Sequence, residues 1–194
     1  VCVIAGAILA GVNEMTKEPI AQSKAATLET AIKAVTPEFD NKPSEESYMV
    51  ATAEGDSVRI YPAKKGDEWV GAAVESFTKK GFGGEIKLIV GFDKEGKIVN
   101  YSVLQHAETP GLGAKMQDWF STDKGNQSII GRAISADGLK VKKDGGDVDA
   151  ITAATISSRA FLDAVNRAYS AYSGVDATGA ATSKSSEEGG NSNE

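Results

Sequence analysis

Cysteine and histidine are almost absent from this sequence, since Cys2 and His106 are the only residues of their types. A Cys-x-x-Cys redox pair, a Cys/His zinc site and a disulfide framework all need more such residues. A Ser-His-Asp triad would have to use His106, and the Gly-x-Ser-x-Gly nucleophile elbow is missing. Any redox chemistry must therefore be carried by an organic cofactor.

Basic clusters are also lacking. The 194 residues include 21 Lys and Arg against 27 Asp and Glu, which gives a net charge of −6. This balance argues against nucleic acid as a partner. A hydrophobic content of 41% and a charged content of 25% are those of an ordinary globular protein. The length suits one domain with a sizeable core and additional terminal segments.

The chain opens with an uncharged apolar run over residues 1–12. Such a run is shorter than the ~20 residues that a helix needs to cross a bilayer. We interpret residues 1–14 as the end of a truncated N-terminal transmembrane anchor, with a signal-peptide core and a short buried helix as the alternatives. Small residues in the run suit close packing against a neighbouring membrane helix.

The middle of the chain has the pattern of an antiparallel sheet. A helical pattern from Ile20 to Val35 ends before Pro37, and a polar loop follows. Strands are then predicted at Tyr48–Ala53, Ser57–Pro62, Trp69–Phe77, Glu85–Asp93 and Lys97–Gln105, with a short late candidate at Gly138–Lys143. After residue 155 apolar positions recur at helical spacing and predict a second long helix. The expected fold is α+β, an antiparallel sheet meander flanked by helices over residues 15–174. Residues 175–194 are rich in Ser, Gly and Glu and predict a disordered acidic tail.

A hydroxyl-rich stretch of small residues, Asp149-Ala-Ile-Thr-Ala-Ala-Thr155, leads directly into the second helical pattern. The first N–H groups of a helix have no partner within it, and the positive end of its dipole lies there, so phosphate binds readily. Thr155 would lie in that first turn with its hydroxyl beside the anion, where a phosphate could be joined to it. The alternative is an ordinary helix start with Thr152 or Asp149 as the N-cap.

A second motif, His106-Ala-Glu-Thr-Pro-Gly-Leu-Gly-Ala-Lys115, follows the clearest predicted hairpin. Pro110 fixes the backbone, while Gly111 and Gly113 allow positive φ and close approach. Such a loop can lie against a flat ring, with Leu112 on its face and free N–H groups toward the ring carbonyls. The alternative is an ordinary turn after a strand.

Together these two motifs resemble those of the RnfG/NqrC family of bacterial FMN-binding electron-transfer subunits. In that family an Asp-x-x-Ser/Thr-Gly-Ala-Thr motif carries FMN through a phosphoester on its last threonine, and Glu-Thr-Pro-Gly-Leu-Gly precedes it. The segment Gly81-Phe-Gly-Gly84 is similar to a third, looser signature. The resemblance implies covalent FMN at Thr155. The implied cofactor-binding residues are Thr155, Thr152, Ala154, Ile156, Ser157, Glu108, Thr109, Gly111, Leu112, Gly113 and Lys115.

Details favour the RnfG type, and the resemblance implies a membrane-bound, ion-translocating complex that couples ferredoxin and NAD⁺. It further implies redox and membrane partner subunits, a flavin transferase for maturation, and a single-pass location at the inner membrane with the domain on the periplasmic side. The domain itself would hold FMN rather than break substrate bonds. The alternatives are an NqrC-type subunit of a sodium-pumping reductase, a membrane-tethered FMN sensor or accessory module, and the carrier domain of a flavin reductase.

One residue departs from the family pattern, because Ala153 stands where glycine is usual. Alanine suits a helical first turn, so the attachment site is expected to survive. Several neighbours have two interpretations. His106 either contacts the flavin or closes the strand end, and Lys115 either pairs with phosphate or is a solvated charge. Ser157 and Ser158 are placed to donate hydrogen bonds to the phosphate, and Arg159 lies one residue further.

Overall fold

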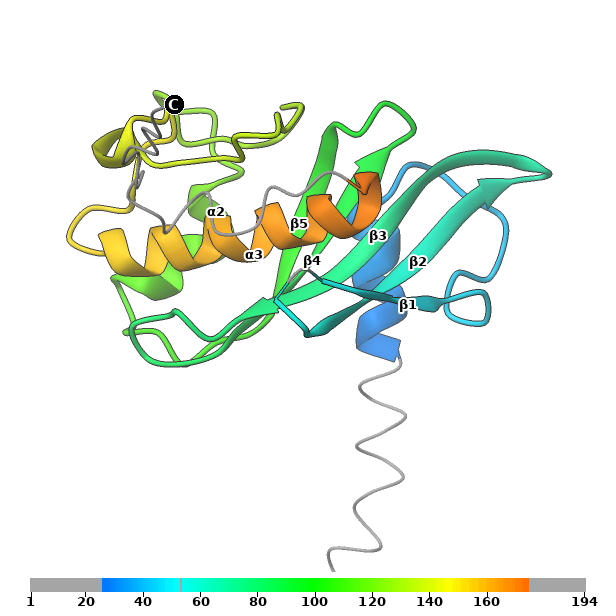
Figure 1. The fold of residues 1–194 in the computed structure, drawn as a ribbon, viewed down its shortest axis with the longest axis horizontal. Helices are drawn as coiled ribbons and strands as arrows, with labels where there is room; N and C mark the ends of the chain where they lie inside the picture. Colours follow the sequence, from blue (N-terminus) through cyan, green and yellow to red (C-terminus); the bar gives the residue numbers. More distant parts are fainter. Residues whose placement is uncertain (1–25, 53, 175–194) are drawn as a thin grey trace, which may run out of the picture.

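The computed structural model describes residues 26–52 and 54–174, and its centre is a five-stranded antiparallel sheet (Figure 1). Strands follow one another in space as they do in the sequence, in the order β1-β2-β3-β4-β5. Their bounds are Tyr48–Ala51 for β1, Ser57–Lys65 for β2, Glu68–Thr78 for β3, Ile86–Asp93 for β4 and Ile98–Gln105 for β5. The α+β fold and the sheet meander that the sequence predicted are confirmed.

A tight turn joins β4 to β5. Between β4 and β5 the side chain of Asp93 accepts hydrogen bonds from the N–H groups of Glu95 and Lys97, each at 2.9 Å. Gly96 completes that turn with φ +79°, a conformation that suits glycine because it has no Cβ. The hairpin predicted from the sequence at this position is therefore confirmed.

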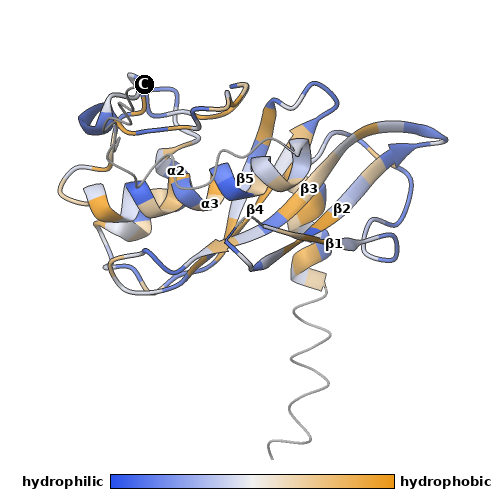
Figure 2. Ribbon diagram, in the orientation of Figure 1, coloured by the Kyte–Doolittle hydropathy of each residue, from blue (hydrophilic) through white to orange (hydrophobic). Residues whose placement is uncertain are grey.

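Both faces of the sheet are covered by helices. On one face a helix over residues 26–35 packs Ile32 and Val35 against a small cluster that includes Tyr61 and Ile89. On the other face α3 (Thr155–Ser173) packs against the larger cluster. Figure 1 shows α3 lying across the strands, and Figure 2 shows apolar residues along the strands and polar ones in the loops around them. Alternating side chains of the central strands face opposite clusters, as the two-residue period of a strand requires.

The long helix ends where the sequence predicted. Gly174 is the C-cap of α3 in the left-handed conformation, with φ +72°, a common way to end a helix. Near this end Tyr172 stacks on Phe92 at a centroid distance of 5.0 Å. Its hydroxyl donates to the carbonyl of Asp93 at 2.6 Å. The C-terminal end of α3 is therefore fastened to the β4–β5 turn.

The prediction of a late strand at Gly138–Lys143 is wrong. Val141 forms only an isolated parallel bridge with Val148, and a 3₁₀ helix, η2, follows at Lys142–Asp144. The backbone N–H and carbonyl of Leu139 are satisfied by the side chain of Asn166 on α3, at 2.8 and 3.1 Å. Leu139 and Val141 are apolar because they pack onto the core, not because they belong to a sheet. Two short helices were not predicted from the sequence: the 3₁₀ helix η1 at Gly113–Lys115 and the α-helix α2 at Met116–Trp119.

The expectations for the anchor at 1–14, for the first part of the helix at 20–25 and for the tail at 175–194 lie outside the described residues. Within the described ranges, no helix has the length and hydropathy required to cross a bilayer.

Candidate functional site

The two sequence motifs meet at the N-terminal end of α3. They line a cleft of about 330 Å³, which is in the range of small-ligand sites. Its walls come from three segments that are far apart in the sequence: the β3–β4 loop, the loop after β5, and the start of α3. The lining residues are Phe82, Thr109, Leu112, Gly113, Ala153, Ala154, Thr155, Ile156 and Ser157. Seven of the eleven residues predicted to bind the cofactor are therefore brought together.

The loop after β5 is shaped by a tight turn. The N–H of Leu112 donates to the carbonyl of Thr109 at 3.1 Å. Between them stand Pro110 and Gly111, and the φ of Gly111 is +76°. Proline followed by a residue of positive φ is the arrangement of a type II turn, which explains why glycine occupies this position. The turn places Leu112 at the cleft.

Glycine is required at position 113 for a different reason. A Cβ there would collide with the hydroxyl of Ser157 and would lie 2.6 Å from a carboxylate oxygen of Glu108. The missing side chain lets the loop lie directly on the first turn of α3. The close approach of the two motifs therefore depends on this one residue.

The start of α3 has no side-chain cap. Ala154 is its N-cap residue, with φ −135°, and no side chain bonds to the first turn. The interpretation with Thr152 or Asp149 as the cap is therefore wrong. No described residue accepts a hydrogen bond from the N–H groups of Thr155, Ile156 or Ser157. These three donors and the positive end of a 19-residue helix meet at the cleft, an arrangement that favours an anion.

Ala153 adopts a left-handed backbone conformation. Its φ is +60°, and among the described residues it is the only non-glycine residue with a positive φ. The expectation that alanine occupies an ordinary helical turn is therefore wrong, because the turn precedes the helix and reverses the chain. This conformation costs an L-residue about 1–2 kcal/mol. The position suits glycine, and strained backbone of this kind clusters at functional sites.

The side chain of Asp149 does not line the cleft and makes its contacts elsewhere. Its carboxylate accepts the N–H of Asn126 at 2.8 Å and pairs with the ammonium group of Lys142 at 2.7 Å. These two hydrogen bonds, with the larger effect from Lys142, lower the pKa of Asp149 below its usual value. Its carbonyl oxygen accepts the indole N–H of Trp119 at 2.9 Å. Asp149 thus fastens the irregular segment that leads into the attachment motif.

The hydroxyls of Ser157 and Ser158 are already engaged inside the protein. Ser157 donates to Glu108, and Ser158 donates to the carbonyl of Ala154 at 2.9 Å. The guanidinium of Arg159 makes two hydrogen bonds to the carboxylate of Asp144, at 2.6 and 2.7 Å. All three side chains therefore make their hydrogen bonds within the protein and not in the cleft.

The four remaining predicted residues lie outside the lining of the cleft. Glu108 is buried beneath it, whereas Thr152, Gly111 and Lys115 are exposed. His106 closes the strand end, because its Nδ1 accepts the N–H of Glu108 at 3.2 Å.

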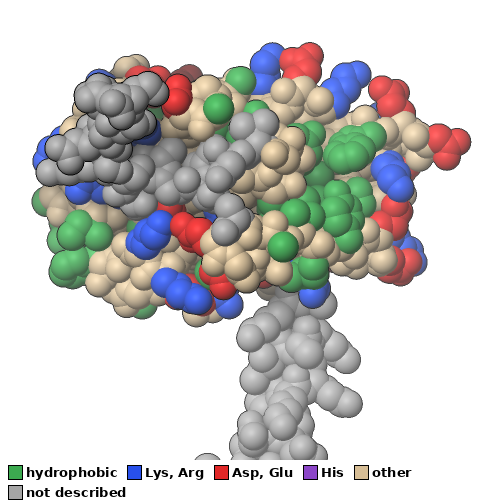
Figure 3. All heavy atoms as spheres, viewed as in Figure 1, with side chains coloured by type: hydrophobic (Ala, Val, Ile, Leu, Met, Phe, Trp, Pro, Cys, Tyr) green, Lys and Arg blue, Asp and Glu red, His purple; other side chains and the backbone are tan. Residues whose placement is uncertain are grey.

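Apolar side chains surround the opening of the cleft. Phe82 is 69% exposed, Leu112 40% and Ile156 51%. In Figure 3 apolar side chains are visible at the end of the molecule where α3 begins. Exposed large apolar groups beside a set of free N–H donors match a ligand with a flat apolar ring and an anionic tail. Phe82 was not among the predicted binding residues, although the Gly81-Phe-Gly-Gly84 motif pointed to it.

Comparisons with known proteins agree with this geometry. A family model described as FMN-binding domain matches residues 81–170, a range that contains all three segments of the cleft. The chain is 36% identical over 174 residues to the G subunit of the ion-translocating oxidoreductase complex of Shewanella amazonensis, covering 84% of this chain and 80% of that protein. It is 37% identical to the protein of the same name from Escherichia coli K12, with 83% and 81% covered.

Proposed function

Because the chain belongs to the family of G subunits of ion-translocating oxidoreductase complexes, we propose that its cleft holds the FMN through which this protein passes electrons. The protein is an electron-transfer subunit of an ion-translocating oxidoreductase, and the flavin supplies the redox chemistry. The observation that carries the proposal is the convergence of both motifs on one cleft at the uncapped start of α3.

Each part of the cleft has a distinct role in this proposal. The N–H groups of Thr155, Ile156 and Ser157 bind the phosphate of FMN, helped by the helix dipole. Leu112 and Ile156 pack against the isoalloxazine ring and exclude water from its face. The exposed opening leaves one edge of the ring accessible, which electron exchange with a partner centre requires.

The finer proposal is that FMN is joined covalently to Thr155. The threonine hydroxyl loses its proton, its oxygen bonds to the flavin phosphorus, and a phosphoester results. A flavin transferase supplies the group from a flavin dinucleotide, and the nucleoside monophosphate of that donor leaves. Thr155 is half-buried, makes no side-chain hydrogen bond with any described residue, and lines the cleft beside the three free N–H groups. Its hydroxyl is thus available for modification.

The remaining assignments follow from the family and from the sequence. We place residues 15–174 as the FMN-binding domain, held at the inner membrane by an anchor that ends near residue 14, with the flavin on the periplasmic side. Other redox and membrane subunits are its partners, and ferredoxin and NAD⁺ are the terminal couples. A covalent bond suits that location, because a dissociated cofactor would be lost from the cell.

This function can be tested by measuring ferredoxin-dependent NAD⁺ reduction in membranes of a complemented host. A host lacking its own G subunit is complemented with the wild-type chain, with Thr155→Ala, or with Thr30→Ala as a control. Thr30 is exposed on the first helix, and its hydroxyl donates only to the carbonyl of Ala26. Ferredoxin-dependent NAD⁺ reduction should fall to the level of the deletion strain for Thr155→Ala alone, at equal abundance of the three proteins. A wild-type rate for Thr155→Ala would overturn the proposal.

A further inference from the structure

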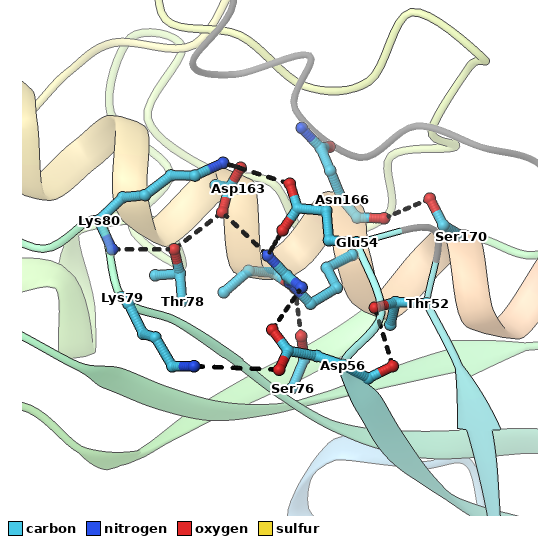
Figure 4. Close-up of polar contacts among 12 residues, drawn as sticks. Thr52, Glu54, Asp56, Ser76, Thr78, Lys79, Lys80, Asp163, Asn166 and Ser170 are labelled. Carbon is cyan, nitrogen blue, oxygen red and sulfur yellow. Dashed lines mark hydrogen bonds and ion pairs between the residues drawn. The ribbon is translucent and has the colours of Figure 1, made fainter.

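The segment that leaves β3 is fastened to α3 before it reaches the cleft. The hydroxyl of Thr78 donates to the carboxylate of Asp163 at 2.8 Å, and the ammonium group of Lys80 donates to the same carboxylate at 3.0 Å. Figure 4 shows these side chains converging from the strand and the helix. Asp163 is almost fully buried. These two hydrogen bonds to Asp163 are the first of two contacts that anchor the β3–β4 loop to α3.

Glu108 provides a second anchor on the other side of Phe82. One carboxylate oxygen accepts the N–H of Gly83 at 2.8 Å, and the other accepts the hydroxyl of Ser157 on α3. Glu108 is only 4% exposed. A buried carboxylate with a partner on each oxygen is a well-satisfied group, and it joins the β3–β4 loop to the first turn of the helix.

Glycines form the slot in which this carboxylate lies. A Cβ on Gly81 would come within 2.7 Å of one carboxylate oxygen, and a Cβ on Gly113 within 2.6 Å of the other. Gly83 has no room for a side chain either, because a Cβ would collide with the carbonyl of Ala107. Gly81 and Gly113, from two different loops, therefore leave space for the carboxylate of Glu108, and Gly83 lets the β3–β4 loop lie against the backbone at Ala107.

Phe82 lies between the two anchors. Its side chain is 69% exposed, yet it lines the cleft together with Thr155. An aromatic side chain so poorly buried by its own protein contributes little to the core. Its loop, in contrast, is held on both sides by buried polar contacts. The structure thus holds an apolar ring in place at the opening of the cleft.

We propose that Glu108 is a positioning residue that holds Phe82 in place as the outer wall of the cleft, against the flavin ring. This inference rests on the proposed function, since it takes FMN on Thr155 as the ligand. Glu108 acts through Phe82 and not by touching the flavin, because both of its carboxylate oxygens have protein partners. Ser157 completes the contact instead of binding phosphate with its hydroxyl.

The shielding of the flavin ring by Phe82 can be tested by iodide quenching of flavin fluorescence. The full chain is used, co-expressed with a flavin transferase. Phe82→Ala and Glu108→Ala should raise the quenching constant by the same amount. The quenching constant of the double variant should be no higher than that of either single variant. Glu108→Gln should be intermediate, because its amide oxygen still accepts the N–H of Gly83. The control is Glu85→Gln, at the far end of the same loop, where the carboxylate pairs with Lys87.

A quenching constant for Glu108→Ala at the wild-type value, with Phe82→Ala raised, would overturn the inference. So would wild-type values for both variants.

Amide hydrogen exchange in the unmodified Thr155→Ala protein provides a readout without flavin. Added to that background, Glu108→Ala should speed exchange at Gly83 about tenfold, the effect expected for loss of one buried hydrogen bond. Unchanged exchange there would contradict the inference. If Glu108→Ala prevents folding, Glu108→Gln and Ser157→Ala decide the same question. A wild-type chain without flavin would refute the proposed function, and the exchange experiment would still decide whether Glu108 holds the loop.

Discussion

The hydroxyl of Ser158 lies directly beneath the N–H of Ile151 and accepts a hydrogen bond from it at 2.9 Å. The same hydroxyl donates to the carbonyl of Ala154. One fully buried side chain in the first turn of α3 therefore fastens the loop that precedes the helix. This contact fixes the turn that contains Ala153 and so the position of Thr155.

Replacing Ser158 by alanine should lower the free energy of unfolding by about 1–3 kcal/mol, because the N–H of Ile151 is left buried without a partner. Urea denaturation measures the effect. The control is Ser121→Ala, since the hydroxyl of Ser121 is exposed and donates to the carbonyl of Asp118. That variant should stay within about 0.5 kcal/mol of wild type. Equal losses for both serines would contradict the role given to Ser158.

Replacing Ala153 by glycine should stabilise the protein. At φ +60° alanine carries a conformational cost that glycine lacks, and we expect a gain of about 1 kcal/mol in the free energy of unfolding. Thermal and urea denaturation report the change. Ala150→Gly, on the same loop but without a positive φ, should instead be destabilising because glycine has more freedom in the unfolded chain. A loss of stability for Ala153→Gly would refute the strained turn.

Acid should weaken the loops around the start of α3. The guanidinium of Arg159 lowers the pKa of Asp144, and the ammonium group of Lys142 lowers that of Asp149. A carboxyl group with a depressed pKa stabilises the folded state above its unfolded pKa of 3.8. That stability is lost as the pH falls through the lower, folded value.

Unfolding free energy measured from about pH 6 downward should therefore decrease below about pH 4. Asp144→Asn and Asp149→Asn should each flatten that decrease. Asp137→Asn is the control, because Asp137 is exposed and the structure describes no hydrogen bond or ion pair for it. A decrease of unchanged steepness in both test variants would show that other groups govern the acid response.

Local patterns in the sequence were enough to predict the sheet and the long helix. The apolar residues of β4 and β5 are concentrated in two short segments separated by the turn at Asp93, and that turn has side-chain chemistry of its own. Most of the cleft was predictable as well, because each motif is contiguous. The late strand failed because burial of Val141 has the same sequence signature whether the partner is a sheet or a helix.

Contacts across long separations were beyond prediction from one sequence. Glu108 and Ser157 are 49 positions apart, and only the folded chain shows that each satisfies the other. The φ of Ala153 was missed because alanine is compatible with a helical turn, although the glycine that is usual at this position in the family is the residue that best tolerates a positive φ. Phe82 was also missed, because an exposed phenylalanine shows no periodicity, although the Gly81-Phe-Gly-Gly84 motif contained it.

Attachment of the flavin to Thr155 can be tested by the mass of a single peptide. The chain is co-expressed with a flavin transferase, denatured, digested, and analysed by mass spectrometry as wild type, Thr155→Ala and Thr30→Ala. We expect the wild-type and Thr30→Ala peptides that contain residue 155 to gain the mass of FMN less one water, and the Thr155→Ala peptide to gain nothing. An unmodified wild-type peptide, or a flavin that persists on the chain in Thr155→Ala, would contradict it.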